Sequence, residues 1–212
     1  SESQQRGNSI ALAAIDGIAI AAFEVGDSIR PDSARAIGEL QRFGITSYLA
    51  SGDNSAATKR VASEVGIADE FVLASATPEM KIAKVRGLQN SNSKVLMIGD
   101  GINDAPALAQ ADIGIAMGSG TDVAIESGNI VLMKNNLLDV PKAIKLSKMT
   151  MYKIKQNMFW ALFYNVLGIP VAAGVFYPFT GWLLNPIIAG GAMAMSSVSV
   201  VTNSLLLKNK KL

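Results

Sequence analysis

Hydrophobic and polar positions follow two different patterns along the chain, and the change falls near residue 157. Residues 10–25 hold two apolar runs joined by Asp16-Gly17, a pair typical of β-hairpin turns. The next segment places apolar residues at helical spacing ahead of a glycine stop: Ala34, Ile37, Leu40, Phe43 and Gly44. A hairpin followed by a helix is therefore predicted for the start of the chain.

Apolar runs and helix-like segments then alternate over short connections. The pattern predicts strands over 45–53, 94–100, 112–117 and 129–133, and helices over 55–66, 77–89, 104–111 and 121–128. Strands that alternate with helices in this way form a parallel sheet covered by helices on both faces. We expect a Rossmann-like α/β fold here.

Beyond this region a long helix is predicted from about residue 136 to 156, and the charges then stop. All 36 Lys, Arg, Asp and Glu residues lie before Gln156 or after Leu207. Residues 158–177 and 182–207 are each long enough to cross a bilayer as a helix. Lysines flank the outer ends of this pair, so the positive-inside rule predicts a transmembrane hairpin with both ends in the cytoplasm. A buried core helix is the alternative for one such run.

Composition narrows the classes of function. The chain has no Cys and no His, which excludes disulfides and the usual thiolate or imidazole metal sites on this chain. Its net charge of +2 provides no broad basic field, so we expect no nucleic-acid partner. The first residues show neither an initiator Met nor a signal pattern, and we expect a piece of a longer protein.

Acidic residues follow two of the predicted strands. Asp53 ends the Ser-Gly-Asp of residues 51–53, Asp100 follows the strand at 94–99, and Lys81 opens the helix between them. Carboxyl ends of parallel strands share one edge of the sheet, where ligands bind. Mg²⁺ takes carboxylate oxygens and phosphate, and a phosphoryl group attracts cationic and N–H donors. With Asp104 four residues on, the cluster fits a phosphoryl-transfer site.

Competing motifs fail at specific positions. A calcium loop would need a polar residue at Ile102 and Glu at Ala111, and a dinucleotide fingerprint would need Gly at Asp104 or at Val123. No phosphate-loop Gly-Lys-Ser/Thr string occurs. On spacing alone, ordinary turn and cap roles for Asp100 and Asp104 stay equally open.

Residues 99–127, GDGINDAPALAQADIGIAMGSGTDVAIES, resemble the hinge signature of P-type ATPases, ion pumps that pass through an aspartyl-phosphate. SGDN resembles their Thr-Gly-Asp motif with Ser51 for Thr, and TPEMK resembles their Pro-Glu-Asp-Lys motif with Met80 for Asp. GDSIRP resembles the segment that leads into their phosphorylation domain. The resemblance covers nearly the whole chain and implies a haloacid-dehalogenase-type fold.

The resemblance implies a catalytic set that acts on ATP with Mg²⁺. Asp100 and Asp104 would hold Mg²⁺, with Asn103 supporting the phosphate. Lys81 would neutralise charge on the phosphoryl oxygens. Ser51 and Gly52 would hydrogen-bond those oxygens, and Asp53 would lie near the ATP end of the site. The full set is Ser51, Gly52, Asp53, Lys81, Asp100, Asn103 and Asp104.

YNVLGIP at 164–170 and MAMSSVSVV at 193–201 resemble the last two membrane segments of copper(I)-transporting heavy-metal pumps. Thioether sulfur suits the soft cation Cu⁺. From the residues alone, ordinary helix packing through small and hydroxyl side chains is the favoured alternative. The resemblance implies an integral protein of the plasma (inner) membrane, copper donor proteins among its partners, and a transport set of Tyr164, Asn165, Met193, Ser196 and Ser197.

Two motifs of these pumps are absent from the sequence: the Asp-Lys-Thr-Gly that carries the phosphorylated Asp, and the Cys-Pro-Cys of the transport path. We expect the end of a nucleotide-binding region at 1–25, a phosphorylation domain without its nucleophile at 26–140, a basic linker helix at 141–157, two transmembrane helices at 158–207 and a cytoplasmic tail at 208–212.

The sequence thus predicts the C-terminal part of an ATP-driven copper(I) efflux pump, inactive by itself. Its partner would be the N-terminal part, which holds the nucleophile, the nucleotide-binding and actuator domains and the Cys-Pro-Cys helix. One rival is a membrane-anchored phosphatase of the haloacid-dehalogenase type, whose nucleophilic Asp-x-Asp is absent here. Another is a non-catalytic remnant or regulatory partner.

Overall fold

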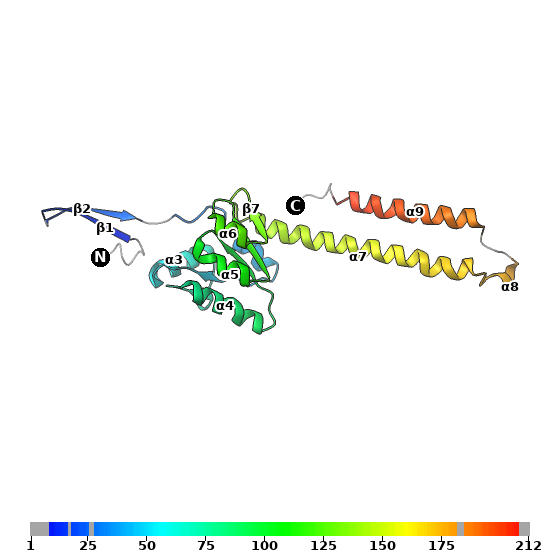
Figure 1. Ribbon diagram of the computed structural model, residues 1–212, viewed down its shortest axis with the longest axis horizontal. Coiled ribbons are helices and arrows are strands. Elements are labelled where there is room, and N and C mark those ends of the chain that lie inside the picture. The colour runs from blue at the N-terminus through cyan, green and yellow to red at the C-terminus, as the bar shows by residue number, and fades with distance from the viewer. Residues whose placement is uncertain (1–8, 17, 26–27, 182–184, 208–212) are drawn as a thin grey trace. The chain divides into compact units, whose positions relative to one another are not determined.

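The computed structural model describes residues 9–16, 18–25, 28–181 and 185–207. The chain divides into two compact units, residues 1–141 and 142–212. The first unit holds the described strands and the helices that follow them, and the second is helical (Figure 1). The division falls within the first turn of the longest helix, α7 (Asp139–Ala172).

The predicted hairpin is confirmed. Strands β1 (Ser9–Ile15) and β2 (Ile18–Val25) pair antiparallel with a bulge between Ala13 and Ala14. Asp16 adopts a left-handed conformation with φ of 51°, which a short polar side chain tolerates in a tight turn; Gly17 lies outside the described residues. Large apolar side chains of the hairpin are exposed, namely Leu12, Ile15, Ile18, Ile20 and Phe23.

The α/β part of the first unit contains two separate groups of parallel strands. One group pairs β3 (Leu49–Ala50) with β4 (Val72–Leu73). The other has the order β5 (Leu96–Gly99), β6 (Ile113–Met117) and β7 (Ile130–Leu132). One continuous parallel sheet was expected, and β4 was missed because two residues are too short to show a period.

Helices follow the strands as predicted. They are α2 (Ser33–Arg42), α3 (Ser55–Val65), α4 (Pro78–Asn90), α5 (Ala105–Gln110) and α6 (Asp122–Ser127). The segment that leads into α2 is tied to the end of the unit, since Asp32 accepts a hydrogen bond from the Leu137 N–H at 2.6 Å and Arg30 donates to the Asn135 carbonyl at 3.0 Å.

Each strand group has a core of its own. Leu108 of α5, Ile115 and Ala116 of β6 and Ala124 of α6 are all at most 1% exposed. The approach of α5 to β6 depends on Gly114, because a Cβ there would lie 2.6 Å from the Leu108 carbonyl oxygen. The second core consists of Ala62, Val65 and Ile67, packed by Ile29, Ile37, Leu49, Phe71 and Val72.

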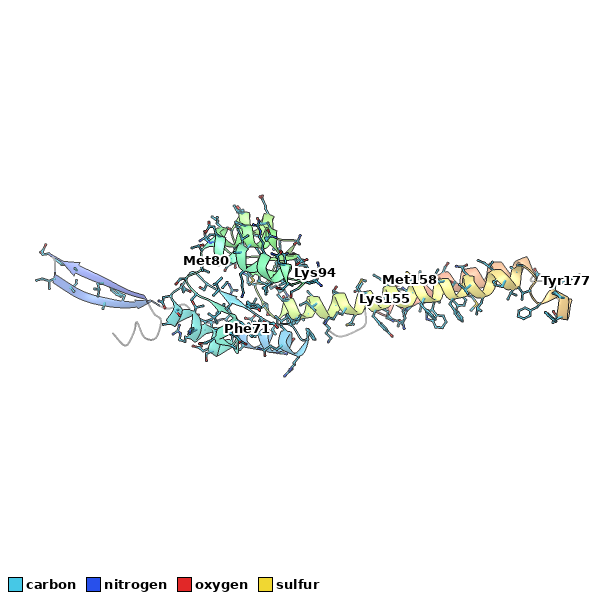
Figure 2. The ribbon with its side chains drawn as sticks, turned by 90° about the horizontal axis from the view of Figure 1, so that it is seen from below. Phe71, Met80, Lys94, Lys155, Met158 and Tyr177 are labelled. Atoms are coloured by element: carbon cyan, nitrogen blue, oxygen red, sulfur yellow. The ribbon has the colours of Figure 1, made fainter. Side chains whose placement is uncertain are left out.

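The second unit is built from α7, α8 (Tyr177–Thr180) and α9 (Pro186–Leu205). The linker helix expected at 141–157 and the first expected span form one continuous helix. Figure 2 shows Lys155 and Met158, where the lysine-rich part of α7 gives way to apolar side chains. Over the residues that the structure describes, no helix combines the length and apolarity needed to cross a membrane. The two spans expected at 158–207 are therefore not confirmed; the apolar part of α7 after Lys155 ends at Ala172.

Helices α7 and α9 are joined by a polar cluster at one end of the pair. The Lys153 ammonium donates a hydrogen bond to Asn203 Oδ1. Asn203 Nδ2 in turn donates to Asn157 Oδ1 at 2.7 Å, and Asn157 Nδ2 donates to Ser204 Oγ at 2.8 Å. These bonds set the register of the two helices.

Asp112 joins three segments just before β6. Its carboxylate accepts hydrogen bonds from Lys94 Nζ at 2.8 Å, from the Val95 N–H at 3.0 Å and from Gln89 Nε2 at 3.1 Å. The Lys94 bond, followed by the Val95 and Gln89 bonds, holds the pKa of the Asp112 carboxyl well below its usual range. Asp112 is thus a structural residue that links α4, β5 and β6.

Replacing Asp112 with Asn should lower the urea midpoint of unfolding at pH 7. A depressed pKa in the folded state gives stability that is present above the ordinary aspartate value of 3.8 and is lost as the pH falls below it. The difference between the two proteins should therefore shrink from about pH 4 downward. As a control, Asp69→Asn removes an exposed pair with Lys59 and should leave the midpoint unchanged. An Asp112 effect that stays constant with pH would contradict this assignment.

Candidate functional site

The centre of the candidate site is an ion pair between Lys81 and Asp104. Thr77 caps α4 by accepting a hydrogen bond from the Met80 N–H at 3.3 Å, which places Lys81 in the first turn. The Lys81 ammonium donates to Asp104 Oδ1 at 2.6 Å, and the two side chains are only 11% and 14% exposed. A charge-assisted bond so little hydrated fixes both side chains.

Glycine at the end of β5 makes room for Asp104. A Cβ on Gly99 would lie 2.6 Å from the Asp104 Cβ, closer than real side chains approach. Asp104 closes the short helix η2 (Ile102–Asp104), and its N–H donates to the Gly101 carbonyl at 3.0 Å. Gly99 therefore allows the carboxylate of Asp104 to lie against the strand end and meet Lys81.

Asp100 follows β5 directly and is exposed. Its carbonyl oxygen accepts a hydrogen bond from the Thr121 N–H at 3.0 Å. A Cβ on Gly120 would lie only 2.7 Å from that same oxygen, so only glycine fits there. Gly120 and Thr121 were not singled out from the sequence as supports of Asp100; the glycine-rich string just before Thr121 was the available signal.

The loop after β3 is held beside the start of α4. Ser51 Oγ donates to Asp53 Oδ2 at 2.8 Å and accepts from the Asp53 N–H at 3.2 Å. The Ala76 N–H donates to the Ser51 carbonyl at 2.8 Å, and the Ser75 N–H donates to the Asp53 carbonyl at 2.7 Å. Residues 75–77 lead directly into α4, so these bonds connect the Ser51–Asp53 loop to the helix that carries Lys81.

The hydrogen bond from Thr77, followed by the one from the Glu79 backbone N–H, lowers the pKa of the Glu79 carboxyl at the N-terminus of α4.

Gly52 lies in open space, since the nearest atom to a Cβ there would be the Ala76 carbonyl oxygen at 3.9 Å. Asn103 is exposed within η2. The geometry gives neither Gly52 nor Asn103 a steric role.

Of the predicted catalytic residues, two pairs are in direct contact, Lys81 with Asp104 and Ser51 with Asp53. In the part of the chain that the structure describes, no three His, Cys, Asp or Glu side chains gather closely enough to hold a metal ion. Asp100 and Asp104 supply the oxygen ligands that Mg²⁺ prefers, and Mg²⁺ commonly takes only one or two carboxylates, with water and phosphate completing its shell. The donor set therefore fits Mg²⁺ shared with a phosphate.

The predicted transport residues lie on α7 and α9. Tyr164 and Asn165 are exposed, and the Asn165 amide donates to the Ala161 carbonyl of its own helix at 2.9 Å. The carbonyl of Ser196 accepts from Ser199 Oγ at 2.7 Å, again within one helix. Ser197 is exposed, and the side chain of Met193 lies outside the described residues. A shared metal site for these residues stays a prediction.

Comparison with known proteins decides the family. Residues 2–112 match the haloacid dehalogenase-like hydrolase family, and residues 81–144 match a second family of the same description. The chain belongs to the haloacid dehalogenase-like hydrolases. This membership agrees with the fold expected from the sequence, with parallel strands and the acidic residues at their carboxyl ends.

This haloacid dehalogenase-like chain is also similar to heavy-metal pumps over most of its length, as its motifs predicted. It is 52% identical to the probable copper-transporting ATPase PacS of Synechocystis sp. over 92% of the chain and 26% of that protein. It is 48% identical to copper-transporting ATPase 2 of Homo sapiens over 97% of the chain and 14% of that protein. The crystal structure of a zinc-transporting PIB-type ATPase in its E2.Pi state gives a TM-score of 0.81 at 33% identity, over 97% of this chain and 32% of that one. The chain thus spans about a quarter of the Synechocystis relative.

Replacing Gly99 with Ala should destabilise the protein by about 1–3 kcal/mol, because the new methyl group forces Asp104 away from Lys81. Gly101→Ala is the matched control two residues on, where the nearest atoms lie at 3.9 Å, and it should change stability by less than about 0.5 kcal/mol. Urea unfolding of the two variants measures both. If both variants lose the same free energy of unfolding, the space beside Asp104 is not the reason that residue 99 has to be glycine.

Proposed function

We propose that the chain is the C-terminal part of an ATP-driven copper(I) efflux pump that forms an aspartyl-phosphate. The observation that carries this proposal is the nearly buried Lys81–Asp104 pair beside Asp100, at the carboxyl ends of parallel strands. A lysine fixed by a carboxylate next to a second carboxylate suits a phosphoryl group with its metal ion. The similarity to proteins named copper-transporting ATPases supports the same class.

The roles of the residues follow from their chemistry. Lys81 neutralises charge that develops on the phosphoryl oxygens, and Asp104 holds its ammonium in place. The Gly52 N–H donates a hydrogen bond to those oxygens, and the Ser51 hydroxyl does so after it turns away from Asp53 Oδ2, to which it donates in this structure. Asp53 lies near the ATP end of the site, and Asn103 supports the phosphate. Asp100 and Asp104 hold Mg²⁺, which when bound reduces the negative charge of the phosphate.

The nucleophile of this reaction has to come from another segment, because no Asp-Lys-Thr-Gly string occurs in the chain. Among the described strands, β3 pairs only with β4 and β5 pairs only with β6, so β3 and β5 each keep one open edge. We assign these edges to the strand that carries the nucleophilic Asp, because an added strand satisfies the backbone groups of an open edge. The exposed apolar residues of the β1–β2 hairpin suit docking onto the nucleotide-binding domain.

The second unit supplies the transport path in this proposal. Residues 157–207 contain no ionisable Asp, Glu, Lys or Arg. Beyond Lys155 the helix exposes a run of large apolar side chains: Met158, Phe159, Leu162, Phe163, Val166, Leu167 and Ile169. Contiguous apolar surface of this kind marks a membrane or protein contact. The second half of α7 and α9 would lie in the plasma (inner) membrane, with the first unit and both ends of the pair in the cytoplasm.

Within the membrane, the proposed cargo Cu⁺ would pass Tyr164, Asn165, Met193, Ser196 and Ser197. Thioether sulfur and small polar groups suit this soft cation better than carboxylates do. Copper donor proteins would deliver it.

The chain mixed with the N-terminal part of such a pump should recover Cu⁺-stimulated ATPase activity, whereas the chain alone should not become labelled from the γ-phosphate of ATP. Asp100→Asn should reduce the recovered activity at least about 100-fold, because the metal loses a charged ligand. Asp112→Asn removes a carboxylate outside the site and should keep the activity at 25 °C and pH 7.

Three results would count against this function. Labelling of the isolated chain would place a nucleophile on it. Hydrolysis of p-nitrophenyl phosphate by the isolated chain, lost in Asp100→Asn, would instead favour a membrane-anchored phosphatase of the haloacid dehalogenase-like family. If the chain binds the N-terminal part without any ATPase activity, and Asp100→Asn leaves this binding unchanged, a non-catalytic regulatory partner would be favoured.

Membrane insertion is tested separately by flotation with vesicles of neutral phosphatidylcholine. Leu167→Lys puts a charge on the exposed apolar part of α7 and should weaken insertion by about 2.5–3.5 kcal/mol. Met151→Lys, at an exposed site on the lysine-rich part of the same helix, should float as the original chain does. Equal flotation of both variants would exclude the apolar half of α7 as the membrane contact.

A further inference from the structure

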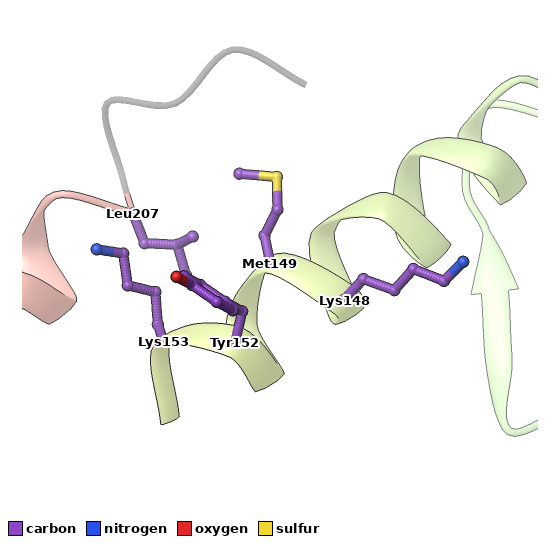
Figure 3. Close-up of a pocket in the computed structure, with 5 residues that line it drawn as sticks. All are labelled: Lys148, Met149, Tyr152, Lys153 and Leu207. Atoms are coloured by element: carbon purple, nitrogen blue, oxygen red, sulfur yellow. The ribbon is translucent and has the colours of Figure 1, made fainter. Parts of the chain in front are cut away.

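A small surface pocket lies where the lysine-rich part of α7 meets the end of α9. It has a volume of about 200 Å³ and is lined by Lys148, Met149, Tyr152 and Lys153 of α7 and by Leu207. Figure 3 shows the Tyr152 hydroxyl and the Lys153 ammonium on the Leu207 side, with the Lys148 ammonium directed the other way. The lining thus joins apolar walls with a hydroxyl and two cationic side chains.

The surroundings of this pocket carry charge of one sign. Residues 140–212 hold eight lysines and no Asp or Glu, a formal side-chain charge of +8, although the whole chain is only +2. All eight lysines lie outside residues 156–207. The pocket is therefore placed between a basic segment and the apolar surface that begins at Met158. An anionic ligand with an apolar body matches both sides.

The size of the pocket limits its ligand to a small chemical group. Pockets that enclose drug-sized ligands measure roughly 300–1,000 Å³, so a nucleotide is too large for a volume of about 200 Å³. A phosphodiester headgroup is small enough, and its acyl chains can leave along the apolar surface. We propose that this pocket binds the headgroup phosphate of an anionic phospholipid; the inference rests on the membrane insertion proposed above.

The polar cluster between the helices prepares the pocket for this ligand. Asn203 Oδ1 accepts one hydrogen bond from the Lys153 ammonium, which has three N–H donors, and so fixes its position without neutralising its charge. The Tyr152 hydroxyl donates to a second phosphate oxygen. Met149 and Leu207 contact the glycerol and the first methylene groups, while Lys148 adds positive potential. Headgroup binding would then favour the paired arrangement of α7 and α9 over a separated one.

The test uses the full chain in a neutral detergent, titrated with dioleoyl phosphatidylglycerol and read by native mass spectrometry. One lipid should bind tightly and saturably. Lys153→Gln should weaken it about tenfold and Tyr152→Phe about threefold, since a charge-assisted hydrogen bond contributes more than a neutral one. Lys153→Arg keeps the charge and should bind as the original does. Lys145→Gln removes the same charge from α7 outside the pocket and should change binding less than about twofold.

The other outcomes distinguish a lipid headgroup from free phosphate, and they separate headgroup binding from the membrane insertion proposed above. Equal weakening by Lys145→Gln and Lys153→Gln would overturn the pocket in favour of diffuse attraction. Equal binding of phosphatidylcholine, which carries the same phosphodiester together with a choline cation, would overturn the selectivity for an anionic headgroup, and displacement by millimolar inorganic phosphate would make the pocket a soluble-anion site. If Lys153→Gln does not fold, Tyr152→Phe decides, because it leaves the Lys153–Asn203 bond intact. A chain that floats with neutral vesicles but shows no preference for phosphatidylglycerol overturns this inference alone. A chain that does not float removes the membrane proposal as well.

Discussion

The ion pair between Lys81 and Asp104 connects the two strand groups of the first unit. Lys81 stands on the helix that leaves the β3–β4 group, and Asp104 stands just after β5 of the other group. Both side chains are nearly buried, so neither charge can return to water without separating the segments. Removing one partner of such a pair leaves an uncompensated charge, which costs far more than the pair contributes as a whole. The position and the electrostatics of the candidate site therefore depend on one contact.

Local signals were sufficient to predict most of the elements. The Asp16 turn and the capped Pro78 start of α4 can be read from a few neighbouring residues, and both are confirmed. Lys81 and Asp104 were predicted to share a site, because parallel strands bring their carboxyl ends to one edge. The catalytic roles of all the site residues stay predictions, and the described geometry leaves Gly52 and Asn103 without a contact that requires them.

The features that were not predicted from the sequence depend on contacts between residues far apart in the chain. Strand β4 exists through its pairing with β3, more than twenty residues earlier. Thr121 and Gly120 support Asp100 only because the loop after β6 folds back onto the end of β5. The division of the parallel strands into two groups is likewise non-local. The continuity of α7 has another origin: a change from charged to apolar residues marks a change of surroundings, while the backbone hydrogen bonds continue unaltered through it.

The open edges of β3 and β5 have a consequence for association with other chains. Among the described residues, an edge strand has no partner for the backbone N–H and C=O groups on its outer side. Unpaired backbone groups of this kind are available to other chains. The edges are short, with two residues in β3 and four in β5, which limits how many hydrogen bonds a wrong partner can make. Short strands thus limit aggregation through these open edges.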